Sequence, residues 1–426
     1  MLSMPFSTVG EQISFTDAVF TSTSATCVTG LTVVDTGTKF SLTGQLIILI
    51  LMQIGGLGIM TISSFFLFII FGQISMTDRD VIIETLTQRP IKNLVSLIRT
   101  TFSFVMITEF LGACGLTIRF LYDYPPDKAI YYGIFHSVSA FCNAGFSLFS
   151  NSFIDYHGDL LINGTLMSLI ILGGIGFYVF LDLKQSIWKY NIRFLSHLSF
   201  NSKIVFLTTL MLIVTGALIF YISESHNTLV EMNTTERILV SFFQSVTART
   251  AGFNTVDISI LSNTSLFFII ILMFIGASPG SCGGGIKTST FTVLYSFVIA
   301  KFKNQNDVNL FKHRIPDETV SRAVSIAFFS IIMIVLFTLS LLICELRGIS
   351  PQDSRGQFLE LLFEVFSAFG TVGLSTGITT GLSNLGKLLV SILMLIGRLG
   401  PLTVAIAFSS QKRMKYRYPK ENLLIG

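Results

Sequence analysis

The sequence is poor in charged residues and in the residue types that usually bind metals. Only 12% of its 426 residues are charged, and it contains five histidines and five cysteines. The cysteines are odd in number, scattered and without metal-site spacing, so they indicate no disulfide framework. The sequence also lacks a G-x-G-x-x-G motif. The chain therefore has no recognisable nucleotide-binding motif, and we expect it to carry no cofactor of its own.

What the sequence has in excess is apolar surface. Apolar residues make up 51% of the chain, which includes 41 phenylalanines, and the mean hydropathy is +0.72. A water-soluble protein of this length could not bury so much apolar surface, whereas a membrane span needs only about 20 apolar residues. We therefore predict an all-α integral membrane protein. Seven long apolar segments are the candidate spans: 42–71, 94–122, 159–181, 203–223, 264–295, 321–346 and 386–410.

The charged residues are distributed asymmetrically between the loops. Eighteen of the 28 lysines and arginines fall in four regions, 72–99, 182–203, 299–322 and the tail 411–426. The positive-inside rule places these regions in the cytoplasm. Fifteen of the 24 acidic residues fall in the segments on the outer side, where they would raise the local concentration of cations. Any single acid could belong to an ordinary solvated loop, so only the asymmetry is informative.

A short glycine-containing motif recurs four times. Each copy has a phenylalanine ten positions before a glycine, and the glycines Gly30, Gly145, Gly252 and Gly373 lie 115, 107 and 121 residues apart. A repeat of this length in a hydrophobic chain indicates a membrane body with internal symmetry. Four extended glycine segments that meet on one axis can replace the water shell of an ion with backbone carbonyls. The repeat therefore predicts a cation pore.

Around this pore we expect four units, each made of a helix, a pore helix and a second helix. Their predicted boundaries are 1–75, 94–184, 203–302 and 321–426. The pore helices of the last three units are expected at about 130–142, 235–248 and 357–369, too short to cross a bilayer. Their C-terminal ends lead into the glycine segments, so the negative ends of the helix dipoles would face a cation. Glycine also permits positive φ, which lets successive carbonyls turn toward one axis.

A second glycine-rich mark follows each of these glycines after 24 to 28 residues, beginning at Gly55, Gly173, Gly276 and Gly397. In the first two units, close helix packing is the simpler interpretation. In the third, residues 276–290 interrupt an apolar stretch with five glycines, a proline and a lysine, and no helix would continue through them. This loop is a candidate gate. It resembles a phosphate-binding loop, but Ile286 separates the last glycine from Lys287, so we do not expect nucleotide binding there.

The motif residues resemble the Trk/Ktr/HKT superfamily of potassium transporters. Ser24–Leu31 and Gln53–Gly58 are similar to its first unit, and Ser139–Phe146, Thr250–Asn254 and Ser367–Leu374 are similar to the other three. The resemblance extends from about residue 12 to the C-terminus, and it is closest to the Ktr-type membrane subunit. One departure is clear. Only about a dozen residues precede the first pore helix here, where the family has a spanning helix.

The resemblance implies potassium uptake, rather than an enzymatic activity, by a homodimer in the cell inner membrane. It also implies a cytosolic ring of nucleotide-binding regulatory subunits and uptake that can depend on Na⁺; we expect no nucleic-acid partner. K⁺ would be coordinated by backbone carbonyls of a selectivity filter formed by Cys27, Val28, Thr29, Gly30, Cys142, Asn143, Ala144, Gly145, Thr250, Ala251, Gly252, Thr371, Val372 and Gly373. Plant relatives that prefer Na⁺ have a serine at the position of Gly30, so Gly30 implies a preference for K⁺. The implied gate residues are Gly276, Gly280, Gly283, Gly284, Gly285, Lys287 and Arg398.

Four charged residues in or beside the apolar segments have their own expectations. A buried arginine in a span is costly and usually functional, although Arg398 could instead form a salt bridge within the bundle. Arg249 is expected to pair with an acid behind the filter, and Lys287 to face the cytoplasmic vestibule. Glu109 fits a buried structural hydrogen bond better than a proton relay.

Two other classes of function stay open at this point. A membrane-embedded transferase for an anionic lipid would use Lys287 and Arg398 to bind phosphate, but acids or histidines should then be clustered beside them. A proton-coupled secondary transporter would need acids near the middle of several spans, and Glu109 is nearly alone there.

Overall fold

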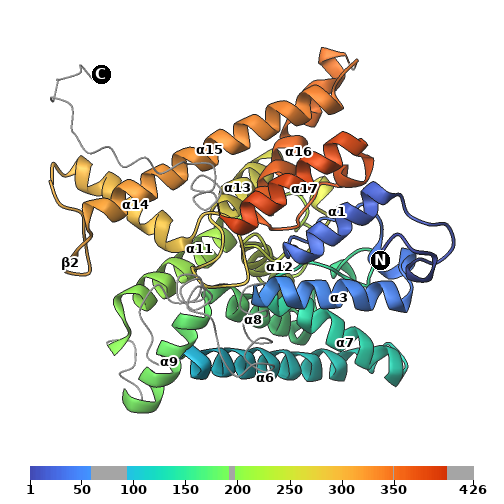
Figure 1. The fold of residues 1–426 in the computed structure, drawn as a ribbon, viewed down its shortest axis with the longest axis horizontal. Coiled ribbons are helices and arrows are strands. Elements are labelled where there is room, and N and C mark those ends of the chain that lie inside the picture. Colours follow the sequence, from blue (N-terminus) through green and yellow to red (C-terminus); the bar gives the residue numbers. More distant parts are fainter. Residues whose placement is uncertain (59–93, 191–196, 349, 401–426) are drawn as a thin grey trace.

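The computed structural model describes residues 1–58, 94–190, 197–348 and 350–400 (Figure 1). Within these ranges the protein is all-α, as predicted, apart from one small hairpin. The hairpin pairs β1 (Asn309–Leu310) with β2 (His313–Arg314) in antiparallel register, inside the basic region 299–322. The parts of the predicted spans and units that fall in 59–93 and 401–426 lie outside the described residues.

The order of elements recurs along the chain: a long helix, a pore helix, a 3-10 turn and a second helix. The three stretches with this order are α6 (Leu94–Phe120), α7 (Pro126–Phe141), η2 (Ile154–Tyr156) and α8 (Leu160–Ile175); α11 (Phe200–Glu224), α12 (Thr234–Thr247), η4 (Ile258–Ile260) and α13 (Asn263–Phe274); and α15 (Asp317–Glu345), α16 (Pro351–Gly370), η5 (Ile378–Gly381) and α17 (Asn384–Leu399). The N-terminal stretch contains η1 (Pro5–Ser7), α1 (Phe15–Thr26), α2 (Thr36–Lys39) and α3 (Leu42–Leu57). We refer to α1, α7, α12 and α16 as the pore helices and to α3, α8, α13 and α17 as the second helices.

The four stretches pack in a cyclic order. Each second helix packs against the pore helix of the following stretch: α3 against α7, α8 against α12, and α13 against α16. The last one, α17, packs back against α1 at the beginning of the chain (Figure 1). The helices therefore form a closed ring, with the segments that follow the pore helices on its inner side.

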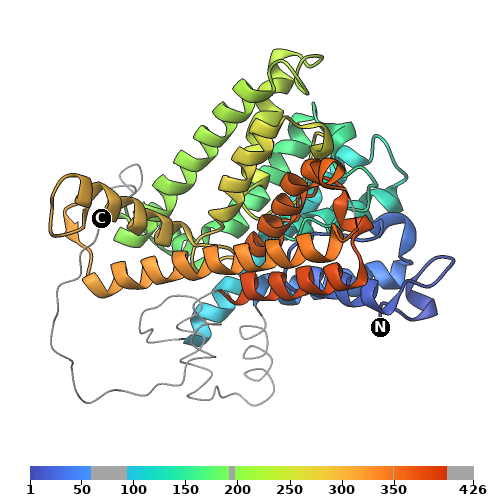
Figure 2. The same cartoon turned by 90° about the horizontal axis from the view of Figure 1, so that it is seen from above.

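The long helices agree only in part with the predicted spans. Among the described residues, α6 (over Arg99–Phe120), α11 and α15 are long and apolar enough to cross a membrane. In Figure 2, α11 (yellow-green) and α15 (orange) run along the outside of the body. The apolar segment predicted at 159–181 is not one continuous helix: α8 and α9 (Phe177–Tyr190) pass as a span only together, and they are bent by 101° at the break between them. The break coincides with Gly176, whose φ is +98°.

The segment 264–295 is also divided. It forms the short apolar helices α13 and α14 (Thr288–Phe302), with the glycine-rich loop between them. This break was expected from the five glycines and the proline, which leave a helix with too little stabilisation to continue.

The second helices begin and end with recurring local signals. Their N-caps are Ser41, Asp159, Ser262 and Ser383, and each side chain accepts a backbone N–H from the first turn. Such caps satisfy donors that have no partner within the helix. Three of the four helices end at a glycine with positive φ, namely Gly58, Gly176 and Gly400. The exception is α13, which ends at Phe274 and leads into the loop.

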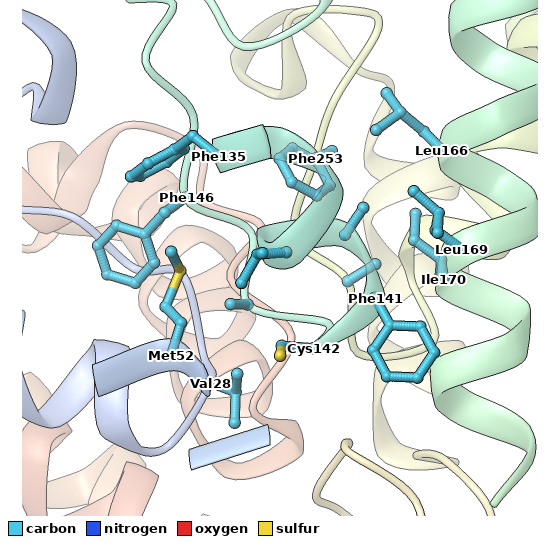
Figure 3. Close-up of a cluster of buried hydrophobic side chains, with 14 of the residues drawn as sticks. Val28, Met52, Phe135, Phe141, Cys142, Phe146, Leu166, Leu169, Ile170 and Phe253 are labelled. Carbon is cyan, nitrogen blue, oxygen red and sulfur yellow. The ribbon is translucent and has the colours of Figure 1, made fainter. Parts of the chain in front are cut away.

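An aromatic core holds the pore helix α7 in place. Phe135 and Phe141 of α7 are fully buried and lie in one cluster with Leu166 and Ile170 of α8 (Figure 3). Phe253, from the segment after α12, joins the same cluster. Removing a buried phenylalanine side chain costs about 3–5 kcal/mol, so this packing gives residues 142–146 a rigid support.

An ion pair joins the first pore helix to the last second helix. Lys387 Nζ of α17 lies 2.7 Å from Asp17 Oδ1 of α1, and the two side chains are only 12% and 17% exposed. Burial by itself raises the pKa of Asp17, but hydrogen bonds from Lys387 and Ser14 outweigh it and leave that pKa below its ordinary value. The pair therefore links α1 to α17, the two helices whose contact closes the ring.

We expect Lys387→Met to destabilise the protein by about 1–3 kcal/mol, since it leaves a mostly buried carboxylate without its cation. Thermal unfolding of the purified protein measures the loss. Lys128→Met, at an exposed lysine of α7, is the matched control. The double variant Asp17→Asn/Lys387→Met should lose less stability than the sum of the losses of the two single variants. If the losses are fully additive, the ion pair contributes nothing.

Candidate functional site

Each pore helix leads into a short segment with the same unusual backbone. Both the glycine and the residue two positions before it have positive φ, between +50° and +93°. The four pairs are Val28 and Gly30, Asn143 and Gly145, Thr250 and Gly252, and Thr371 and Gly373. Positive φ is rare for a β-branched residue, so the surrounding structure must hold Val28, Thr250 and Thr371 in this conformation.

The four glycines follow one another in a closed ring. A Cβ atom added to Gly30 would lie 2.5 Å from the Ala144 carbonyl oxygen and 2.9 Å from Gly145 Cα. Gly145 faces Ala251 and Gly252 in the same way, and Gly252 faces Val372 and Gly373. Gly373 faces the Thr29 carbonyl and Gly30, which closes the ring. Only glycine allows the four backbones to approach so closely.

A hydroxyl group of each pore helix fastens the segment that follows it. Ser24 Oγ accepts the Gly30 N–H at 3.1 Å, and Ser367 Oγ accepts the Gly373 N–H at 3.0 Å. In the other two copies the hydroxyl donates to the carbonyl just after the glycine, from Ser139 to Phe146 (2.8 Å) and from Thr247 to Phe253 (2.6 Å). These hydroxyls were not predicted to have a role, although three of them stand six positions before the glycine.

The glycine-rich marks of the second helices support the pore helices from behind. A Cβ atom on Gly55 would collide with the Thr26 carbonyl, one on Gly173 with that of Phe141, and one on Gly397 with that of Phe369. These three carbonyls stand four positions before the segment glycines. The contacts agree with the interpretation of Gly55 and Gly173 as packing positions, and they extend it to the last unit.

The glycine-rich loop between α13 and α14 packs against the end of α8 and against the segments that follow the pore helices. Its backbone bonds to the end of α8, where the Ser278 N–H donates to the Gly174 carbonyl (3.0 Å) and the Cys282 N–H donates to that of Gly173 (3.2 Å). Residues Gly283 to Ile286 are buried, and Ile275 and Ile286 pair across the base of the loop. The loop is thus an ordered element of the interior.

The same loop touches the segments themselves. The Gly284 N–H donates to Thr371 Oγ1 at 2.9 Å, and a Cβ atom on Gly283 would collide with Thr250 Oγ1. These contacts show that the side chains of Thr250 and Thr371 face the loop, and both residues have positive φ. Asn143, a third, shares a hydrogen bond of 3.1 Å with Thr250. The loop therefore lies directly against two of the four segments.

The two cationic residues predicted for the gate bind backbone carbonyls. Arg398 of α17 donates to the carbonyls of Cys282 in the loop and Gly55 in α3. Lys287 turns back onto the loop, with its Nζ 2.7 Å from the Gly283 carbonyl oxygen. Arg398 forms no ion pair within the described part of the chain, so the structure does not support the alternative of a bundle salt bridge.

The predictions for the other two charged residues, Glu109 and Arg249, differ in outcome. Glu109 accepts a hydrogen bond of 3.2 Å from Gln53 Nε2 and lies 3.9 Å from Cys142 Sγ, which agrees with the structural role predicted for it. Arg249 was expected to pair with an acid, and this is wrong for the residues that the structure describes: its guanidinium has no ion pair there.

The structure thus brings together the residues predicted at the four segments, 27–30, 142–145, 250–252 and 371–373. It also brings the residues predicted for a gate, Gly276, Gly283, Gly284, Gly285 and Arg398, to one place beside them. Gly280 lies further along the loop, where its carbonyl accepts the Phe177 N–H at the break between α8 and α9.

Comparison with known proteins identifies the family. The TrkH model, described as a cation transport protein, matches residues 3–416. The chain belongs to the TrkH family. It is 37% identical to the Ktr system potassium uptake protein B of Bacillus subtilis, over the whole of this chain and 93% of that one. Identity is also 37% to the protein of the same name from Vibrio alginolyticus, over 91% of its length.

Other members of the TrkH family are similar as well. The potassium/sodium uptake protein NtpJ of Enterococcus hirae is 36% identical over the whole of this chain and 93% of its own. The crystal structure of the potassium transporter TrkH from Vibrio parahaemolyticus matches with a TM-score of 0.72, covering 93% of this chain and 79% of that one. At 18% identity this match shows the fold. Together with the long apolar helices, family membership makes this a membrane protein.

Proposed function

We propose that this chain takes up K⁺ across the cell inner membrane as a multi-pass pore subunit. The observation that carries the proposal is the closed ring of Gly30, Gly145, Gly252 and Gly373. In this ring the carbonyls of Thr29, Ala144, Ala251 and Val372 each lie against the Cα of a neighbouring glycine. Four backbone carbonyls around one axis can replace the hydration shell of a monovalent cation. The ring and the segments that form it are the selectivity filter in this proposal.

The pore helices favour a cation at this ring. Their C-terminal ends point into the four segments, at Cys27, Cys142, Ala248 and Gly370. The end of a helix carries a partial negative charge of roughly half an electron, so four such ends stabilise a cation between them. This arrangement supports cation transport over a transferase, since Lys287 and Arg398, the phosphate-binding candidates, are bound to backbone carbonyls.

The loop between α13 and α14 serves as the gate in this proposal. It lies against Thr250 and Thr371 of the filter and is tied to three second helices: α8 by the bonds of Ser278 and Cys282, and α3 and α17 by Arg398. Because glycine makes the loop easy to rearrange, a small shift of the surrounding helices can displace it.

Control comes from outside the chain, because an open cation pore would dissipate the membrane potential. We propose a homodimer that binds a cytosolic nucleotide-binding ring through the basic regions, above all 299–322 and 411–426, with uptake that can depend on Na⁺. In the described region 299–322, Lys301, Lys303 and Lys312 are exposed around the β1–β2 hairpin, while Arg314 is paired with Asp307. Exposed cations favour a salt-sensitive association.

Gly30→Ser should lower the preference for K⁺ over Na⁺ at least tenfold, since the side chain would displace the Ala144 carbonyl from the ring. Tracer uptake of both ions into vesicles with the reconstituted protein measures it. Gly377→Ser is the matched control, because Gly377 also has positive φ (+98°) but no atom within 4 Å of an added Cβ. Equal uptake of the two ions by the unaltered protein would contradict the proposal.

Lys287→Met should raise uptake several-fold in the absence of the nucleotide-binding partner, because it removes the bond that holds Lys287 to Gly283. Deleting Gly283–Gly285 should have a larger effect in the same direction. Lys303→Met, at an exposed lysine beyond α14, is the control. If both loop variants fold and their uptake still follows the partner as before, the loop is a linker and no gate.

Replacing Lys301, Lys303 and Lys312 together with glutamate should weaken copurification of the nucleotide-binding partner at least tenfold and reverse its dependence on salt. Lys128→Glu is the control, because Lys128 is an exposed lysine of α7 in a segment predicted to lie on the outer side of the membrane. Undiminished binding would mean that the partner docks elsewhere.

A further inference from the structure

The recurrent phenylalanine of the four units is followed by a residue that differs from unit to unit. This residue lies on the pore helix, nine positions before the filter glycine, and its side chain is buried in every unit. In the four units it is Thr21, His136, Phe243 and Glu364. The four residues that follow each filter glycine leave the filter on its outer side, and we call them the outer turn. Two of the four side chains, those of His136 and Glu364, form hydrogen bonds that lead to the outer turn of their own unit.

In the second unit, the imidazole of His136 binds the outer turn directly. Its Nε2 accepts the Leu148 N–H at 3.1 Å and lies 3.2 Å from Ser147 Oγ. Its Nδ1 lies 2.8 Å from the Tyr132 carbonyl oxygen, so the ring donates to the pore helix and accepts from the turn. Ser147 stands two positions after the glycine, and its Oγ accepts the Phe149 N–H at 3.0 Å. The ring thus fastens the turn to the pore helix.

The fourth unit repeats this arrangement with a carboxyl group. Ser375 also stands two positions after its glycine, and its Oγ accepts the N–H two residues further on, from Gly377, at 3.0 Å. Ser375 Oγ shares a hydrogen bond of 2.8 Å with Thr379 Oγ1, and Thr379 donates to Glu364 Oε1. Glu364 therefore reaches the equivalent serine through one hydroxyl group. Its Oε2 has no hydrogen-bond partner, so Oε1 alone forms the anchor.

The other two units have no such anchor among the described residues. Thr21 Oγ1 is buried there without a hydrogen-bond partner, and the side chain of Phe243 has no group that could form a hydrogen bond. The outer turn of the third unit is held from the second unit instead, where the Phe153 N–H donates to the Asn254 carbonyl at 3.0 Å. The ring of Phe153 packs against His136, with 5.0 Å between the ring centroids. His136 therefore supports two of the four outer turns.

We propose that His136 and Glu364 are positioning residues that set the selectivity of the filter by holding the outer turns of two opposite units. This inference rests on the proposed function, because it assumes that K⁺ is selected at the glycine ring. The second and fourth units lie opposite each other, since the ring passes through the units in order. Neither side chain needs to touch the ion, because each acts through the turn that it holds.

In these two units, each segment is tied to its own pore helix at two places. One tie is the hydroxyl of Ser139 or Ser367, which binds beside the glycine, and the other is His136 or Glu364 at the outer turn. With both ties in place, the carbonyls cannot move along the pore axis unless a hydrogen bond breaks. Selectivity depends on how these carbonyls surround the ion, so release of the outer turn should weaken it.

The first test measures the anchors without transport. Hydrogen–deuterium exchange of the purified full-length protein should be about fivefold faster over residues 146–149 in His136→Phe, and over residues 374–377 in Glu364→Leu, because each variant releases its own turn. Thr21→Val is the matched control, since it removes a hydroxyl without a partner at the equivalent position, and exchange over residues 31–34 should not change. Unchanged exchange at both turns overturns the inference.

The second test is tracer uptake of K⁺ and Na⁺ into vesicles with the reconstituted protein. His136→Phe and Glu364→Leu should each lower the preference for K⁺ about fivefold. The variants His136→Gln and Glu364→Gln keep an acceptor at the same place and should restore most of the preference. Thr21→Val should behave like the unaltered protein. If the anchor variants lose stability or total uptake but keep the ratio of the two ions, the residues only support the fold and the inference is overturned.

Two milder variants keep the test open if the anchor variants fail to fold. Ser147→Ala and Ser375→Ala remove the hydroxyls on the turn side, and both should shift the preference in the same direction. An unchanged ratio in both contradicts the inference. If the unaltered protein does not prefer K⁺ at all, the proposed function fails and the inference falls with it. If it prefers K⁺ and the variants keep that preference, only the inference fails.

Discussion

The close approach of four backbone segments at Gly30, Gly145, Gly252 and Gly373 is the constraint on which the rest of the structure depends. Each glycine leaves no room for a Cβ atom against the carbonyl of the next segment. The position of every segment is therefore fixed by its two neighbours. The hydroxyl bonds from the pore helices, the glycines of the second helices and the aromatic core around α7 all keep the segments at this distance.

Much of this arrangement could be predicted from the sequence, because its signals are local. The glycines mark the segments, and α7, α12 and α16, the three pore helices with predicted bounds, end within one residue of the predicted positions. The positive φ of Val28, Thr250 and Thr371 could not be predicted, since β-branched residues avoid this conformation unless tertiary contacts impose it. The break at Gly176 was missed for a similar reason. The sequence is apolar on both sides, and the bend accompanies contacts with Pro279 and Gly280, about a hundred residues away.

The cations of the interior show a second limit of sequence reasoning. An acidic side chain is the partner that a cation in an apolar segment suggests, but Arg398 is bound by the carbonyls of Cys282 and Gly55. A loop without helical hydrogen bonds has free carbonyls, and a guanidinium with five donors can satisfy several of them. Every residue has a carbonyl, so the sequence alone does not distinguish the few that are free.

The contact between α17 and α1 has a consequence for biosynthesis. Asp17 and Lys387 are 370 residues apart, so the partner of the first pore helix leaves the ribosome long after that helix does. Until then α1 lies beside α3 with one flank uncovered and its carboxylate without a cation. The intermediate units can assemble in order, each against the one before it. Ring closure therefore has to await α17, and a nascent chain that stalls before α17 exposes to lipid, chaperone or protease the flank of α1 that α17 covers in the folded protein.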